Sequence, residues 1–185
     1  MSEASFRGKL LVAVPTLLDP NFARTVVLLL EHNDEGAVGV VLNRPSDTDI
    51  DEPLPGLSRL AASPPVVFVG GPVAPGAAIC LARAASDEGA DRWQQVLDRL
   101  GTLELSDEPD PLVPGVTEIR VFAGYAGWGP GQLEDEIEAG GWFVIDADAD
   151  DALSPFPERL WRAVLLRQGG NVALFANYPP HPSLN

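Results

Sequence analysis

Short apolar runs separated by turn-forming residues recur along the chain, and they predict a protein built mainly from β-strands. Runs of roughly four to eight residues, rich in valine and bounded by Gly, Pro, Asn or Asp, are typical of buried strands. The predicted strands cover residues 10–14, 26–30, 38–42, 66–69, 78–81, 119–123, 142–145 and 172–175. The second and third flank the turn Asn33–Gly36, so we expect them to pair as an antiparallel hairpin.

Apolar residues spaced i, i+3, i+4 and i+7 predict amphipathic helices at a few other places. These helices cover residues 92–100, 132–139 and 158–168, with a further short helix within 57–62. Gly101 would end the first of them. The rest of residues 45–65 is expected to be a surface connection. Because strands come first and helices follow without regular alternation, we expect an α+β fold in a single domain, residues 1–185.

Composition then excludes several kinds of partner. The formal net charge is -15, and a polyanion repels nucleic-acid phosphates, so we expect no direct binding to DNA or RNA. The longest apolar runs, such as residues 26–30, are too short to span a bilayer, and we expect no membrane partner. Cys80 is the only cysteine and cannot form an internal disulfide. With no signal-peptide pattern at the start, the expected location is the cytoplasm.

Familiar cofactor and metal motifs fail when their residues are checked. Residues 127–131 (Gly-Trp-Gly-Pro-Gly) follow a predicted strand and precede a predicted helix, as a dinucleotide loop would. However, Pro130 removes a backbone donor, and the acidic residues 134–136 would repel a bound phosphate. The acidic stretch 146–151 lacks the glycine of a calcium loop, and the two histidines are not spaced as zinc ligands. We therefore expect no cofactor and no metal.

The glycine-rich stretch Gly124–Gln132 is the strongest candidate for a binding site. Two other glycine- or proline-marked blocks also follow predicted strands, and loops at strand ends can converge. The candidate ligand-binding residues are Asn43, Arg44, Gly70, Gly71, Tyr125, Gly127, Trp128, Gly129 and Gln132. We expect them to line one concavity that binds a small polar ligand or a peptide. The alternative is that the glycines only allow close packing and Trp128 is buried beneath the loop.

An enzyme remains the other class to weigh. Glu31 and Glu134 with His32 could form a hydrolase-type acid–base site. Against this, a histidine at a strand end more often hydrogen-bonds its hairpin, and Cys80 in an apolar strand is expected to be a buried small side chain. The residues favour a non-enzymatic protein and identify no catalytic set.

Five blocks together resemble the YqgE/AlgH family of bacterial proteins. They are residues 11–15 with 19–22, residues 31–33 with 36–39, residues 42–45, residues 70–73 and residues 124–137, in matching order from about Gly8 to Tyr178. The resemblance implies a small closed or bifurcated, mainly antiparallel β-sheet surrounded by helices. Many relatives carry a histidine where this chain has Ala82, which argues against an obligatory catalytic histidine there.

The resemblance implies little about activity. The family is largely uncharacterised, and one branch is described as a transcriptional regulator of alginate synthesis. For this chain it leaves open a binding protein for a small ligand or an unknown protein, and a regulator. Given the negative charge, such a regulator would act through a protein partner rather than by touching DNA.

Overall fold

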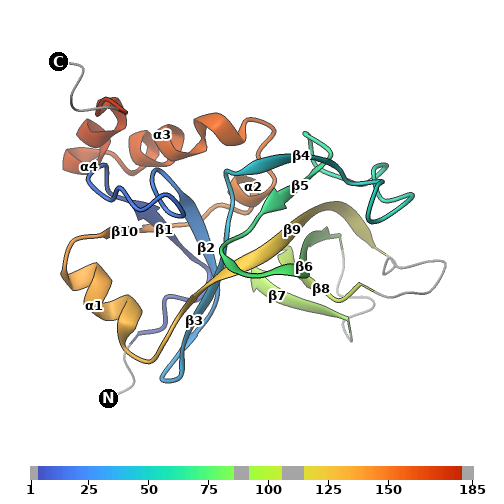
Figure 1. The fold of residues 1–185 in the computed structure, drawn as a ribbon, viewed down its shortest axis with the longest axis horizontal. Coiled ribbons are helices and arrows are strands. Elements are labelled where there is room, and N and C mark those ends of the chain that lie inside the picture. Colours follow the sequence, from blue (N-terminus) through green and yellow to red (C-terminus); the bar gives the residue numbers. More distant parts are fainter. Residues whose placement is uncertain (1–3, 86–91, 106–114, 181–185) are drawn as a thin grey trace.

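The computed structural model describes residues 4–85, 92–105 and 115–180, and one curled, mostly antiparallel sheet dominates them (Figure 1). Its strands are β1 (Lys9–Ala13), β2 (Val26–Asn33), β3 (Gly36–Val41), β4 (Pro45–Asp49), β5 (Val66–Val69), β6 (Val73–Ala84), β7 (Trp93–Leu97), β8 (Leu100–Leu103), β9 (Val116–Trp128) and β10 (Trp142–Asp146). The order is β10-β1-β2-β3-β9-β6-β8-β7, with β4 and β5 beside this path.

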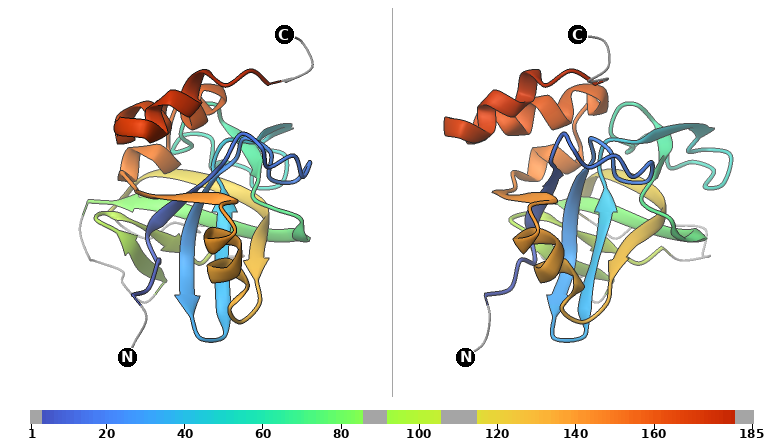
Figure 2. Two further views of the ribbon diagram at one scale, coloured as in Figure 1. Left: turned by 90° about the vertical axis from the view of Figure 1, so that its left-hand side faces the viewer. Right: turned by 60° about the vertical axis from the view of Figure 1, so that its left-hand side comes forward.

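Helices are short within the described part of the chain. They are α1 (Gln132–Glu138), α2 (Ala149–Ala152), α3 (Pro157–Gln168) and α4 (Gly170–Leu174), followed by the 3₁₀ helix η1 (Phe175–Asn177). Figure 2 shows α1 beside the strands at one end of the sheet and α3 lying across its top. The α+β class and the mainly antiparallel sheet are confirmed, but the helices cover parts of a half-barrel and do not surround it.

The sheet divides at β9, the longest strand. Along one edge of β9, its C-terminal residues Ala126–Trp128 pair antiparallel with β3. Nearer its N-terminus, Phe122 and Ala123 pair in parallel with β5. On the other edge, β9 pairs along most of its length with β6. The apolar side chains buried against this divided sheet form separate clusters.

Three clusters form the core. The largest includes Leu28, Leu81 and Phe122 of the sheet together with Trp161 of α3. A second lies between α1 and strands β1–β3. The third lies between strands β6, β8 and β9 and the segment that carries Ile50 and Leu57.

Several predicted elements are confirmed. β2 and β3 form the expected antiparallel hairpin, with Asn33 opposite Gly36 at its turn. Strands at 66–69 and 142–146 and helices at 132–138 and 157–168 also lie where the pattern placed them. In each of these segments the spacing of apolar residues is clear and a turn residue or proline marks one end. The local sequence and the tertiary packing therefore favour the same secondary structure.

The helix predicted over residues 92–100 is wrong, because this segment forms the β7–β8 hairpin. Asp98 turns the chain with a φ of 49°, and Gly101 lies within β8 opposite Ala82 and Gln95. The apolar side chains of this hairpin are divided between two of the core clusters. Trp93 packs in the third cluster and Leu100 in the largest. Strand pairing with β6 overrides the helical spacing.

Two shorter predictions are also wrong. The expected strand at residues 172–175 is helical in α4 and the start of η1, where Leu174 is 74% exposed. A short apolar run alone does not distinguish strand from helix. The expected helix at residues 57–62 is instead a series of turns, closed by i to i+3 hydrogen bonds such as the one from the Leu60 N–H to the Leu57 carbonyl. Ala61 also forms a single parallel β-bridge with Ile119.

Candidate binding site

Gly70, Gly71 and Gly124 meet at the point where the sheet divides. The Gly70 carbonyl accepts the Val41 N–H at 2.8 Å, and its own N–H donates to Ala123. A Cβ on Gly70 would lie 2.3 Å from the Gly124 carbonyl oxygen, and one on Gly71 would lie 2.2 Å from the Tyr125 backbone. Residues 124–128 therefore belong to strand β9 and are not the loop that the sequence suggested. Glycine is needed here because backbones touch.

Asn43 and Arg44 point back into the fold from the end of β3. The Asn43 amide donates to the Arg24 carbonyl at 2.9 Å and accepts the Val26 N–H at 3.0 Å. The Arg44 guanidinium donates to the Ala23 carbonyl, and burial lowers its pKa, although nearby Asp19 opposes that shift. The polar atoms of Asn43 are thus used to hold the segment before β2.

Trp128 helps to attach α1 to the sheet through Glu136, which also binds Gln132 within the helix. The indole N–H groups of Trp128 and Trp142 both donate to Glu136 Oε2 at 2.9 Å. Gln132 donates to the other oxygen of Glu136, and its own Oε1 accepts the Gly129 N–H. Trp128 is 6% exposed and packs against Phe22 and Trp142. Sequence reasoning missed Glu136, although its i, i+4 spacing from Gln132 was a usable signal.

His32 has both ring nitrogens engaged. Nδ1 accepts the Phe6 N–H at 3.0 Å, so the ring proton lies on Nε2, which is 2.6 Å from Glu134 Oε1. A hydrogen bond with its own backbone N–H and the His32 contact lower the pKa of Glu134. Ser5, Asp34 and Asp135 help to line a pocket of about 530 Å³ here.

Of the three residues considered for an acid–base site, the structure brings His32 and Glu134 together but leaves Glu31 apart. Glu31 precedes His32 on β2, and adjacent strand residues point to opposite faces. Glu31 accordingly lines a different pocket from the one lined by His32 and Glu134. The ring nitrogens of His32 bond the N-terminal segment and α1, and not the hairpin as the sequence suggested. Neither nitrogen is free to act as a base.

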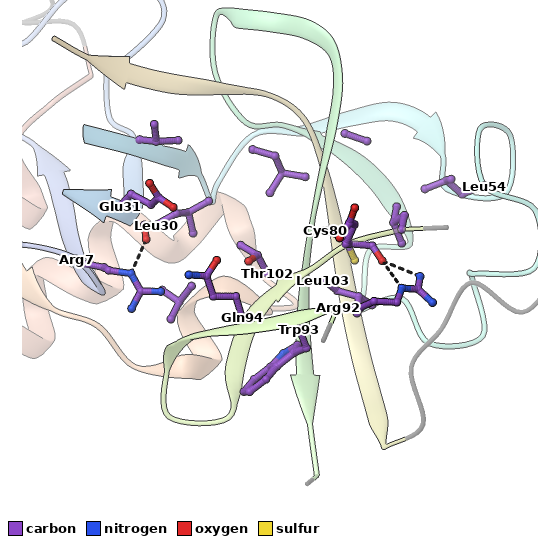
Figure 3. A pocket seen from close by; sticks show the side chains of 16 residues that line it. Arg7, Leu30, Glu31, Leu54, Cys80, Arg92, Trp93, Gln94, Thr102 and Leu103 are labelled. Atoms are coloured by element: carbon purple, nitrogen blue, oxygen red, sulfur yellow. Dashed lines mark hydrogen bonds between the residues drawn. The ribbon is translucent and has the colours of Figure 1, made fainter. Parts of the chain in front are cut away.

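The larger pocket, of about 1020 Å³, lies between the β2–β3 and β7–β8 hairpins, and we call it the hairpin groove (Figure 3). Arg7, Leu30 and Glu31 line one end, while Leu54 and Arg92 line the other. Apolar side chains between the ends are Val38, Ile79 and Val96, and the uncharged polar ones are Gln94 and Thr102. A concave, partly apolar site with a few polar groups can bind a small molecule.

None of the nine predicted residues lines the hairpin groove or the His32 pocket. The structure does bring Gly70 and Gly71 against residues 124 and 125, but Trp128 packs against α1, and Gln132 is the first residue of that helix. Their part in ligand binding stays a prediction. Half of the residues that line the groove lie within 92–105. Residues 92–100 of this stretch were predicted to be helical, and no motif marks the others.

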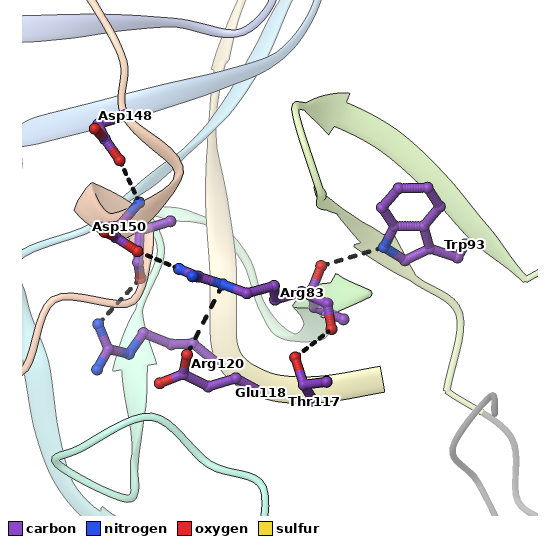
Figure 4. Close-up of polar contacts among 9 residues, drawn as sticks. Arg83, Trp93, Thr117, Glu118, Arg120, Asp148 and Asp150 are labelled. Carbon is purple, nitrogen blue, oxygen red and sulfur yellow. Dashed lines mark hydrogen bonds and ion pairs between the residues drawn. The ribbon is translucent and has the colours of Figure 1, made fainter. Parts of the chain in front are cut away.

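Two arginines, the buried Arg120 and the half-buried Arg83, join the sheet to the segment around α2 (Figure 4). The Arg120 guanidinium donates to the carbonyls of Ser63, Ala152 and Ser154 at 2.7–3.0 Å, and burial lowers its pKa to about 10. Arg83 donates to Asp150 at 2.5 Å. These contacts are with the protein's own backbone and surface, so they anchor the fold.

Other reactive chemistry is limited within the described ranges. Burial raises the pKa of the Cys80 thiol to about 12, which keeps it protonated at neutral pH. No cluster of three His, Cys, Asp or Glu side chains among residues 4–85, 92–105 and 115–180 could hold a metal. None of the helices in these ranges has the length and apolar character needed to span a membrane.

The amino-acid sequence is similar to a known protein family and to several bacterial proteins. A family model described as AlgH-like matches residues 10–173. A UPF0301 protein of Streptomyces coelicolor is 50% identical, over 98% of this chain and 96% of that protein. A UPF0301 protein of Mycobacteroides abscessus is 44% identical, over 96% of this chain and 87% of that protein.

Two solved structures are similar throughout. A crystal structure of a Corynebacterium diphtheriae protein matches with a TM-score of 0.87 and 31% identity, over 95% of this chain and 93% of that chain. The solution structure of the AlgH protein from Pseudomonas aeruginosa matches with a TM-score of 0.69 and 31% identity, over 98% of each chain.

Proposed function

Since the chain belongs to the AlgH-like family, and the relatives above carry no named activity, we propose that it is a non-enzymatic binding protein whose site is the hairpin groove. The observation that carries the proposal is the groove itself, a pocket of about 1020 Å³ formed by two hairpins of the half-barrel. Its ligand would be a small amphipathic molecule, since partly exposed valine and isoleucine side chains lie beside an amide and a hydroxyl.

The state of the reactive side chains supports binding rather than catalysis. A general base needs a free nitrogen or oxygen within reach of a substrate. Both nitrogens of His32 are hydrogen-bonded to the protein, and the Cys80 thiol is buried and protonated. Thr102 and Gln94, the uncharged polar groups of the hairpin groove, suit hydrogen bonding to a ligand.

Thermal unfolding of the full chain with a panel of amphipathic small molecules tests the proposal. A ligand that binds only the folded protein at 100 times its Kd stabilises it by about 2.7 kcal/mol, which raises Tm. Val38→Trp should remove this shift because the larger ring fills the groove. Val73→Trp, at a valine that is 38% exposed and outside the groove, should keep it. The proposal fails if no compound raises Tm, or if Val38→Trp responds like the unaltered chain.

A further inference from the structure

We infer that the ligand of the hairpin groove is a monocarboxylate with an apolar chain, and that Arg7 binds the carboxylate. The inference rests on the proposed function, because it names the ligand class of the same site. Four features carry it: the fixed position of Arg7, its missing counter-ion, the apolar surface beside it, and the single carboxylate at the same end of the groove.

Arg7 is held in place by two strands that are far apart in the sequence. Its Nε donates to the Leu30 carbonyl of β2 at 2.9 Å, and its Nη2 donates to the Gln95 carbonyl of β7 at 2.6 Å. The next residue, Gly8, also lies close to β7, since a Cβ added to it would be 3.1 Å from the Val96 carbonyl oxygen. The guanidinium therefore faces the groove in a defined orientation (Figure 3), and little side-chain entropy remains to be lost on binding.

The positive charge of Arg7 has no carboxylate partner in the described part of the chain. Both of its acceptors are neutral carbonyl oxygens. The ion pairs among the described residues use other cations: Lys9, His32, Arg83, Arg159 and Arg167. Nη1 of Arg7 has no described acceptor, and the planar guanidinium fork matches a carboxylate. A ligand carboxylate would supply the missing counter-ion.

The surface next to Arg7 suits an apolar chain. Leu30, Val38, Ile79 and Val96 line the groove, and the last three are only partly buried in the unliganded protein. Covering such surface is worth about 25 cal/mol per Å². A ligand with its carboxylate on Arg7 would lay its chain along these side chains toward Cys80 and Leu103.

Glu31 limits the charge that the ligand can carry. Its exposed carboxylate lines the same end of the groove as Arg7 (Figure 3). A second negative charge on the ligand would meet this carboxylate with no further cation at that end, and the protein as a whole carries -15. A monoanion is therefore favoured over a phosphate monoester or a dicarboxylate.

Calorimetric titration of the full chain with octanoate and octanol tests the inference, because the probes share a chain and differ in charge. Arg7→Gln should weaken octanoate binding at least about tenfold, as expected for a lost charged hydrogen bond, and leave octanol unchanged. Glu31→Gln should tighten octanoate binding a few-fold by removing repulsion. Arg59→Gln and Glu35→Gln make the same charge changes outside the groove and should leave both affinities unchanged.

The possible results distinguish a wrong role for Arg7 from a groove that binds no ligand at all. If octanol and octanoate bind equally and Arg7→Gln affects neither, the groove binds apolar chains but Arg7 selects nothing, which overturns the inference alone. If Arg7→Gln weakens both probes equally, Arg7 acts by holding β7, and the inference is again overturned. If neither probe binds, the hairpin groove is not a site for amphipathic molecules, and the proposed function fails as well.

Discussion

Gly124 has a φ of 73°, and a Cβ on it would lie 2.6 Å from the Gly71 carbonyl oxygen. Gly127, on the same strand, has a φ outside the left-handed range, and a Cβ on it would lie no closer than 3.6 Å to any neighbour. Glycines in one motif thus differ in how much the fold needs them. The sequence shows their density, but backbone contacts between β9 and the segment before β6 decide which are required.

These two positions give a matched pair of substitutions. Gly124→Ala should lower the free energy of unfolding by more than about 3 kcal/mol, because it adds left-handed strain to a clash with rigid backbone. Gly127→Ala should change it by less than about 1 kcal/mol. Urea unfolding followed by circular dichroism measures both. Equal losses at the two positions would mean that the division of the sheet does not depend on Gly124.

Elements were predictable from sequence where one local signal dominated. The β2–β3 hairpin has valine-rich strands around a glycine turn, and α3 has both its apolar spacing and a proline at its start. The β7–β8 hairpin was missed because its apolar residues happen to fit a helical spacing, while its stability comes from pairing with β6. The hairpin groove was missed for the same reason, since it exists only once β7 and β8 lie beside β2 and β3.

Helix α1 depends on one acidic side chain for its position. Glu136 accepts hydrogen bonds from Trp128, Trp142 and Gln132, which joins the helix to β9 and β10. Glu136→Gln replaces one acceptor oxygen with a donor group that faces the existing donors. The free energy of unfolding should therefore fall by about 1–3 kcal/mol.

Tryptophan fluorescence during urea unfolding measures this change and reports directly on the indoles that contact Glu136. Glu138→Gln is the control, since Glu138 is exposed at the end of the same helix and should change stability by no more than about 0.5 kcal/mol. If the two substitutions have the same effect, α1 is held by its apolar face, through Leu133 and Ile137, and not by the Glu136 hydrogen bonds.

At the scale of the whole molecule, the distribution of charge argues against a function that requires direct binding to nucleic acid. The chain carries 27 acidic and 12 basic side chains. Many of its arginines are already committed to the protein: Arg120 to backbone carbonyls, Arg83 and Arg167 to aspartates, and Arg24 to the Trp161 ring. A nucleic-acid surface needs a stripe of available cations, so any regulatory role would have to pass through a ligand or another protein.

The full chain should therefore show no saturable binding to duplex DNA at physiological salt. Phosphate neutralisation supplies most non-specific affinity, and a protein with a net charge of -15 repels the polyanion instead. A mobility-shift titration up to micromolar protein, repeated at low salt, measures this, with a basic DNA-binding protein of similar size as the positive control. Lowering the salt should not restore binding, because weaker screening strengthens the repulsion. Saturable binding that strengthens as salt falls would contradict the prediction and would require a face on which the arginines gather.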